Sequence, residues 1–156
     1  MDILFGRHLE YLSDVPTEFT RGLMNTIDWD SRLVMIRGPK GVGKSTLMQQ
    51  YVLNNFGSTD RHILYCSADT AYFSSHTLID TASEFVKKGG KVLLIDEIHK
   101  YENWSREIKE IYDLYKGLKV ILSGSSLIQL NDGQADLSRR ADVYDMPGLS
   151  FREYLW

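Results

Sequence analysis

Residues 38–45 read Gly38-Pro39-Lys40-Gly41-Val42-Gly43-Lys44-Ser45 and match the pattern G-x-x-x-x-G-K-[ST] at every fixed position. From average residue frequencies, a chain of this length matches by chance in about 0.5% of cases. Glycine permits a tight turn, so successive backbone N–H groups and the positive end of the following helix can converge on phosphate. Lys44 can then reach the β- and γ-phosphates, and the Ser45 hydroxyl can bind Mg²⁺. We therefore predict a nucleotide phosphate-binding loop made by Gly38, Pro39, Lys40, Gly41, Val42, Gly43, Lys44, Ser45 and Thr46.

Short apolar runs alternate with helical patterns along the rest of the chain. Helical spacing predicts helices over 4–12 and after Lys44, Thr77 and Asn103; Thr77 and Asn103 are the candidate N-caps, Thr77 forming a capping box with Asp80. Strands are predicted at 33–37, 62–66, 91–95, 118–122 and 142–146. Several are apolar on both faces, which is typical of strands in a sheet that helices cover on each side. The alternation predicts the α/β class. With the loop, it indicates a three-layer P-loop NTPase of the RecA/AAA-like kind, with a five-stranded parallel sheet and helices on both faces.

Two adjacent carboxylates, Asp96 and Glu97, end the apolar strand at 91–95. In a parallel sheet the carboxyl ends of the strands border the ligand crevice. We expect Asp96 to hold Mg²⁺, directly or through water, and Glu97 to orient or deprotonate the attacking water. Without the phosphate loop, the pair would be read as a solvated charge pair at a strand end.

Two further groups are candidates for contact with the γ-phosphate. Ser125, or as second choice Ser123, follows the strand at 118–122 and could sense that phosphate; the alternative is a Ser/Gly turn that begins the next helix. Arg139 or Arg140, just before the last strand, could act as an arginine finger toward a neighbouring subunit of a homo-oligomer. The alternative for these arginines is a solvated basic pair near a helix end.

Composition excludes several classes of protein. The chain has 156 residues, and 18 Lys+Arg against 21 Asp+Glu give a net charge of 18 − 21 = −3. With 43% hydrophobic residues, intrinsic disorder is excluded, and no apolar run approaches the ~20 residues of a membrane span. The single cysteine, Cys66, and the lack of a signal peptide suit the cytoplasm. The mild acidity gives no indication of nucleic-acid binding.

The sequence favours ATP over GTP as the nucleotide, and it gives the histidines no metal-binding role. The D-x-x-G pattern at 145–148 comes too late in the chain for a GTPase, and no N-K-x-D motif for guanine is present. Four histidines, His8, His62, His76 and His99, show no metal-ligand spacing, so surface or cap roles are expected.

The phosphate loop, the Asp96-Glu97 pair and the turn at Ser125 together resemble AAA-type P-loop ATPases. Residues 149–155, Leu-Ser-Phe-Arg-Glu-Tyr-Leu, are similar to a stretch in a prokaryotic group of these ATPases that carries a C-terminal domain of unknown function. The resemblance covers nearly the whole chain. It implies Lys44 and Ser45 for phosphate and Mg²⁺, Asp96 and Glu97 for metal and water, Ser125 as a polar sensor, and Arg139 or Arg140 as the finger.

The resemblance also implies parts that this sequence does not contain. We expect residues 1–156 to be the N-terminal nucleotide-binding core, with the helical lid and the C-terminal domain missing, so that ATP hydrolysis by this chain would be weak. The predicted function is Mg²⁺-dependent ATP hydrolysis that drives or switches an attached domain. Two alternatives remain: a nucleotide-dependent conformational switch with little turnover, and a helicase-type motor, because residues 96–99 spell D-E-x-H.

Overall fold

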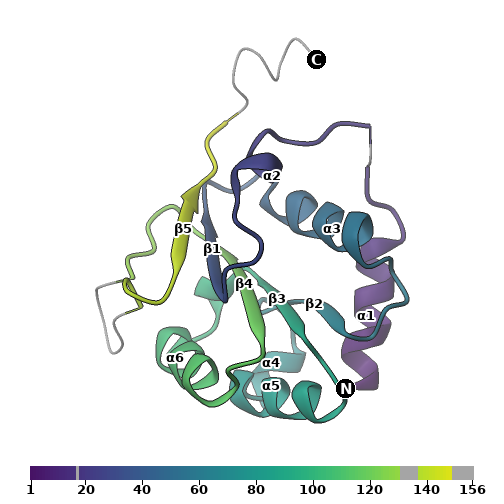
Figure 1. Ribbon diagram of the computed structural model, residues 1–156, viewed down its shortest axis with the longest axis vertical. Helices are drawn as coiled ribbons and strands as arrows, with labels where there is room; N and C mark the ends of the chain where they lie inside the picture. The colour runs from purple at the N-terminus through teal and green to yellow at the C-terminus, as the bar shows by residue number, and fades with distance from the viewer. Residues whose placement is uncertain (17, 131–136, 149–156) are drawn as a thin grey trace.

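Five parallel strands form one sheet in the computed structural model, which describes residues 1–16, 18–130 and 137–148 (Figure 1). The spatial order is β2-β3-β4-β1-β5, so β1 lies between β4 and β5. Every connection returns the chain to the same end of the sheet. All carboxyl ends of the strands therefore meet at one edge, which is where a parallel sheet binds its ligands. The strands are β1 Leu33–Arg37, β2 Ile63–Ser67, β3 Val92–Asp96, β4 Lys119–Gly124 and β5 Asp142–Asp145.

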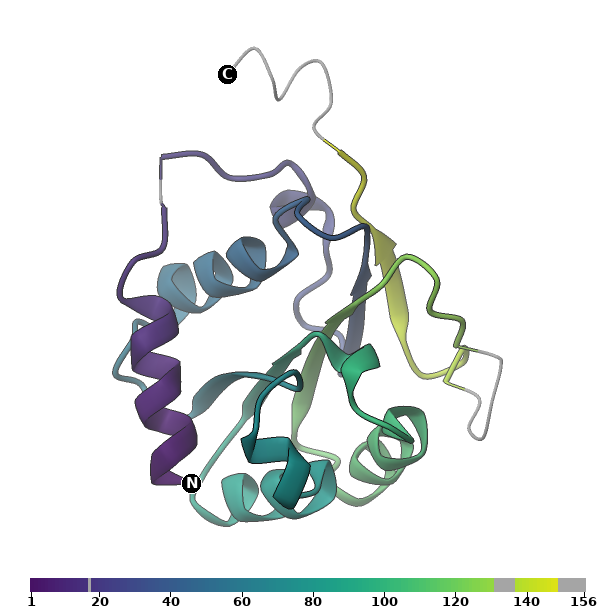
Figure 2. The same ribbon diagram turned by 180° about the vertical axis from the view of Figure 1, so that it is seen from behind.

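Helices cover both faces of this sheet (Figures 1 and 2). On one face lies α3, whereas α5 and α6 lie together on the other. The described helices are α1 Asp2–Leu12, α2 Leu23–Thr26, α3 Lys44–Asn55, α4 Tyr72–Ser75, α5 Leu78–Lys87 and α6 Trp104–Leu114, with a 3₁₀ turn, η1, at Ile98–Lys100. None of them combines the length with the apolar composition that a transmembrane segment requires.

The core is split into two layers because successive strand residues point to opposite faces. In β1, Leu33 and Met35 belong to the layer under α5 and α6, whereas Val34 and Ile36 belong to the layer under α3. All four side chains are fully buried. This double burial explains why successive residues of β1 are apolar rather than alternating between apolar and polar.

Helix α1 covers the outer edge of β2. Its buried His8 accepts a hydrogen bond at Nδ1 from the Tyr65 backbone N–H, 2.9 Å away. An edge strand otherwise presents unpaired amides, which invite pairing with another chain. The contact satisfies one such amide and fixes α1 beside the sheet.

The predicted elements are confirmed, with shifts of one or two residues at their ends. The predicted strand at 33–37 matches β1, and the predicted N-cap Thr77 accepts from Asp80 N–H through Oγ1 at 3.1 Å. Asn103 occupies the predicted N-cap position of α6, but its backbone is left-handed, with φ 63°, and its side chain makes no cap hydrogen bond. Asparagine tolerates that conformation, so at this position it serves the turn before α6. The stretch 149–155 lies outside the described residues.

Candidate functional site

A cavity of about 490 Å³ opens at the carboxyl edge of the sheet, where the segments after four neighbouring strands converge. The loop after β1 contributes residues 38–40, and the first turn of α3 adds Lys44 and Ser45. β3 contributes Asp96 and Glu97, and the turn after β4 contributes Ser125. Residues far apart in the sequence meet here because the strands are parallel.

The loop conformation depends on three glycines. Gly41 and Gly43 have φ of 86° and 100°, values that side chains with a Cβ rarely adopt. Gly43 precedes the first turn of α3, so the loop leads directly into the helix N-terminus. A Cβ on Gly38 would lie 2.5 Å from the Met146 carbonyl oxygen, which explains the need for glycine there.

Lys44 is buried against the inside of this loop. Its Nζ donates to the carbonyl oxygens of Gly38 at 2.7 Å and Pro39 at 3.0 Å, and the residue is only 6% exposed. The loop therefore holds a cation on its inner side at the N-terminus of α3, and the backbone N–H groups of a helix N-terminus favour negative charge. This arrangement can bind a phosphate group.

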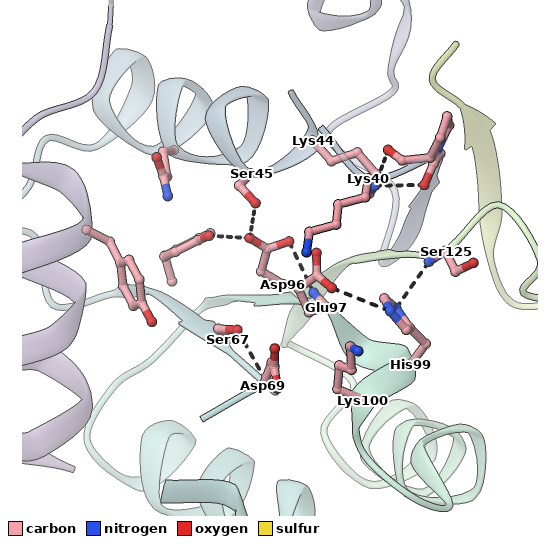
Figure 3. A pocket seen from close by; sticks show the side chains of 15 residues that line it. Lys40, Lys44, Ser45, Ser67, Asp69, Asp96, Glu97, His99, Lys100 and Ser125 are labelled. Carbon is pink, nitrogen blue, oxygen red and sulfur yellow. Dashed lines mark hydrogen bonds and ion pairs between the residues drawn. The ribbon is translucent and has the colours of Figure 1, made fainter. Parts of the chain in front are cut away.

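Asp96 receives four hydrogen bonds, two on each carboxylate oxygen. Oδ2 accepts from Ser45 Oγ and Tyr65 Oη, while Oδ1 accepts from Ser123 Oγ and the Glu97 N–H. The residue is 3% exposed. Burial and the Asp96 charge together raise the pKa of Tyr65, so this phenol remains a donor. The four donors fix the carboxylate toward Ser45 on α3 (Figure 3).

The donor set fits a magnesium site. Ser45 and Asp96 offer one hydroxyl and one carboxylate in direct contact. Mg²⁺ prefers oxygen ligands and is usually held by one or two carboxylates together with substrate phosphates. Among the described residues there is no group of three or more histidine, cysteine or acidic side chains that could bind a metal by themselves.

Glu97 follows Asp96 in a left-handed backbone conformation, with φ 57° and ψ 42°. Such a conformation is costly for a residue other than glycine, and it is found most often at functional sites. Here it turns the chain from β3 into η1. The Glu97 side chain is about one-third exposed and lies in the cavity, 3.4 Å from His99 Nε2. It is therefore open to water, unlike Asp96.

The two serines differ in what they contact. Ser123, the second choice in the sequence, is fully buried and donates to Asp96 while accepting from the Glu97 N–H at 3.0 Å. Ser125 lines the cavity, and its Oγ accepts from the Leu127 N–H at 3.1 Å, as expected for a turn. Both proposed positions are therefore at the site, with Ser123 beneath the carboxylates and Ser125 at the rim.

Arg139 and Arg140 do not reach this cavity. They precede β5 and so lie at the amino end of that strand, opposite to the phosphate loop. Arg139 is exposed, and Arg140 forms an ion pair with Asp113 on α6 at 3.5 Å. Within one chain, neither arginine lines the predicted site, as expected for residues predicted to act on a neighbouring subunit. A role toward a second copy stays a prediction.

A second cavity of about 320 Å³ lies on the other side of the loop, lined by Gly41, Val42, Gly43 and Thr46. Its outer wall is the segment before α2, which includes Phe19 and Arg21. Gln50 on α3 donates to the Phe19 carbonyl oxygen at 2.8 Å, and Arg21 donates to that of Val42 at 2.6 Å. These bonds hold the wall against α3. Each residue predicted in the loop thus lines one of the two cavities.

Comparison with known proteins identifies the family. Residues 30–155 match the family model described as an AAA domain, which is most of the chain. The chain belongs to the AAA domain family. No curated protein matches its sequence. A solved structure of C. elegans PCH-2 shares the fold, with a TM-score of 0.50 and 16% identity. The alignment covers 93% of this AAA domain and 40% of the PCH-2 chain, so the similarity concerns a part of that protein.

Sequence reasoning missed several side chains that line the site of this AAA domain. Ser67 ends β2 and Asp69 follows it, and the rule used for β3 would have found them, because β2 ends at the same edge. His99 was assigned to an ordinary role, yet it lies two residues after Glu97 and contacts it. No sequence pattern marks Tyr65 as a residue of the site. It lies inside an apolar strand, and only the pairing of β2 with β3 brings it to Asp96.

Proposed function

We propose that this AAA domain binds ATP with Mg²⁺ and hydrolyses it to ADP and phosphate. The observation that carries the proposal is the contact of Ser45, in the first turn after the phosphate loop, with Asp96 at the end of β3. It joins the phosphate-binding element to a carboxylate beside a second, solvent-accessible carboxylate, Glu97. Phosphoryl transfer requires little more from a protein than this combination of positioning and charge.

The residues would divide the work as follows. Lys44 would neutralise the β- and γ-phosphates, with the backbone of 38–43 around them. Ser45 and Asp96 would hold Mg²⁺, which supplies charge neutralisation between the phosphates. Glu97 would accept hydrogen bonds from the attacking water and orient it, because its carboxylate is exposed to the cavity while Asp96 is not. Ser125, at the rim, would contact the γ-phosphate.

The second cavity offers a place for the nucleoside. Gly41, Val42 and Gly43 line it, while Gly38, Pro39 and Lys40 line the first, so a chain of phosphates crossing the loop would join the two. Phe19, whose ring is 37% exposed, could pack against a base. The preference for adenine over guanine rests on the missing N-K-x-D motif and stays a prediction, as do the attached domain and the helical lid.

Calorimetry with ATP and ADP in the presence of Mg²⁺, followed by phosphate release on the same samples, tests the proposal. Lys44→Ala should abolish measurable binding, because the loop loses the cation on its inner side. Glu97→Gln should keep binding but lower phosphate release by a factor on the order of 10² or more, since it removes the carboxylate that orients water. Lys87→Ala, a lysine on the distant helix α5, is the matched control and should behave as the wild type.

The outcomes separate the alternatives. Binding that survives Lys44→Ala would contradict the loop assignment. Binding without phosphate release in the wild type would contradict hydrolysis and favour the nucleotide-dependent switch. Phosphate release that appears only with DNA or RNA, at a rate that rises with the polymer's length, would favour the helicase-type motor.

A further inference from the structure

We infer that His99 is a positioning residue that couples the orientation of Glu97 to the turn at Ser125; this inference rests on the proposed hydrolysis. His99 lies in the cavity between the two residues (Figure 3). Its Nδ1 accepts from the Ser125 backbone N–H at 3.1 Å, and its Nε2 lies 3.4 Å from Glu97 Oε2. One imidazole thus contacts both the candidate base and the turn expected to meet the γ-phosphate.

The first contact decides the state of the imidazole ring. A nitrogen that accepts from an N–H must carry a lone pair, so Nδ1 is unprotonated in this arrangement. In the neutral ring the proton is then on Nε2, the atom that faces the Glu97 carboxylate. The protonated Nε2 therefore faces Glu97 Oε2 in an electrostatic contact at 3.4 Å, while Nδ1 accepts the hydrogen bond from the Ser125 amide. A shift of the turn at Ser125 would therefore move the imidazole and change its contact with the Glu97 carboxylate.

The surrounding backbone holds the imidazole in place. His99 belongs to η1, whose Ile98 is fully buried, and the turn closes by hydrogen bonds from Lys100 N–H to the Glu97 carbonyl and from Tyr101 N–H to the Ile98 carbonyl. On the other side, a Cβ on Gly124 would lie 3.4 Å from His99 Nδ1. The ring is therefore at ordinary contact distance from the end of β4, whereas the atom that a side chain at Gly124 would clash with is Ile128 Cδ1.

The arrangement has a consequence for catalysis. Glu97 is held by a left-handed backbone and is partly exposed, so its carboxylate has few groups that fix its direction. A general base works only when it is aimed at the proton that it takes. Losing a partner that orients a site residue costs about 10- to 100-fold in activity. His99 contacts no residue of the phosphate loop among the described contacts, so nucleotide affinity should not depend on it.

Two substitutions in the full 156-residue chain separate hydrogen bonding from packing. His99→Phe keeps a planar ring and removes both contacts, whereas His99→Gln keeps one donor and one acceptor on a single amide group. We expect His99→Phe to lower kcat by about 10- to 100-fold while KM and the Kd of ATP stay within about twofold, and His99→Gln to recover most of kcat. His62→Phe, an exposed histidine at the start of β2, is the matched control and should leave kcat unchanged.

An unchanged kcat in His99→Phe, a parallel rise of Kd, or equal losses in the Phe and Gln variants would each overturn the inference while leaving the proposed hydrolysis intact. A wild type that binds ATP and releases no phosphate would overturn the proposed hydrolysis. The contacts of His99 are then decided by ¹⁵N NMR of the imidazole, with its signals identified by their loss in His99→Gln. The Nε2-protonated neutral tautomer supports the coupling, and the Nδ1-protonated form overturns it.

Discussion

At the scale of single residues, the site is organised around the Asp96 carboxylate rather than around the loop alone. Four donors converge on it, three from side chains of α3, β2 and β4 and one from the backbone N–H of Glu97. A buried carboxylate is tolerated only when hydrogen bonds replace the water that it has lost. Ser123 has a special place among these donors, because its hydroxyl also accepts from the Glu97 N–H. It thereby ties the two acidic residues together.

Replacing Ser123 by alanine should therefore destabilise the AAA domain. Asp96 Oδ1 loses a donor and the Glu97 amide loses an acceptor in a fully buried place. The Glu97 N–H still donates to Asp96 Oδ1, so the main loss is one hydrogen bond to a charged group, and we expect the free energy of unfolding to fall by about 1.5–3 kcal/mol. Urea denaturation measures it, with the exposed Ser126→Ala as control. Equal stability of the two variants would show that the Ser123 hydroxyl contributes nothing beyond its volume.

At the scale of elements, the contact of α1 with β2 connects a helix outside the sheet to the strand that carries Tyr65. The link is the hydrogen bond from the Tyr65 N–H to His8 Nδ1, while the Tyr65 hydroxyl donates to Asp96. The backbone of one residue thus holds the edge helix, and its side chain holds the acidic centre. Displacement of α1 should therefore shift Tyr65 and weaken its hydrogen bond to Asp96.

This contact makes the stability of the α1–β2 pair depend on pH. Burial, with a smaller contribution from the charge of Arg61, lowers the pKa of His8 below its ordinary 6.5. The unfolded chain then binds the proton more tightly than the folded one, so stability is fully present above about pH 6.5 and falls as pH drops below it. The loss amounts to at most about 1.4 kcal/mol per pH unit for one proton.

Asparagine at position 8 provides the test, because its side-chain oxygen can accept from Tyr65 and does not titrate. Thermal or urea denaturation between pH 5 and 8 should show a steeper loss of stability toward acid in the wild type than in His8→Asn. Parallel curves for the two proteins would mean that His8 does not titrate in a buried state.

At the scale of the whole molecule, the two candidate fingers lie at the opposite end of the sheet from the phosphate loop. Arg140 is occupied by Asp113, and Arg139 is exposed beside it. An arginine so placed can act on a nucleotide only if a second copy of the chain presents its loop to it. Activity in trans would then require association between copies.

We therefore predict that the specific ATPase activity rises with protein concentration and that Arg139→Ala removes this rise. An arginine finger contributes on the order of 10³-fold or more to kcat of the associated form. Phosphate release across a concentration series, followed together with light scattering, measures both quantities. Arg106→Ala, an exposed arginine on α6, is the control. Constant specific activity in samples that do associate would show that Arg139 is a solvated surface residue.

Much of the fold could be predicted from local sequence. Double burial gives the inner strands runs of consecutive apolar residues, and Thr77 marks the start of α5 by the hydrogen bond that its side chain accepts. The glycines of 38–43 specify a turn that other residues cannot form. The phosphate loop is recognised from its glycine-lysine pattern, and Asp96, Glu97 and the turn at Ser125 are recognised because they lie at or just after the carboxyl end of a strand.

Only the tertiary structure shows which side chains the pairing of the strands brings together at the site. The sequence does not encode the order β2-β3-β4-β1-β5 locally, yet that order alone brings Tyr65 and Ser123 to either side of Asp96. It also decided which of two serines supports the carboxylates and placed His99 between Glu97 and Ser125. Apart from the contact of His99 with Glu97, these contacts join residues separated by 26 to 31 positions. Motifs record residues that act through their neighbours in the chain, whereas side chains that act across a sheet become visible only when the strands are assembled.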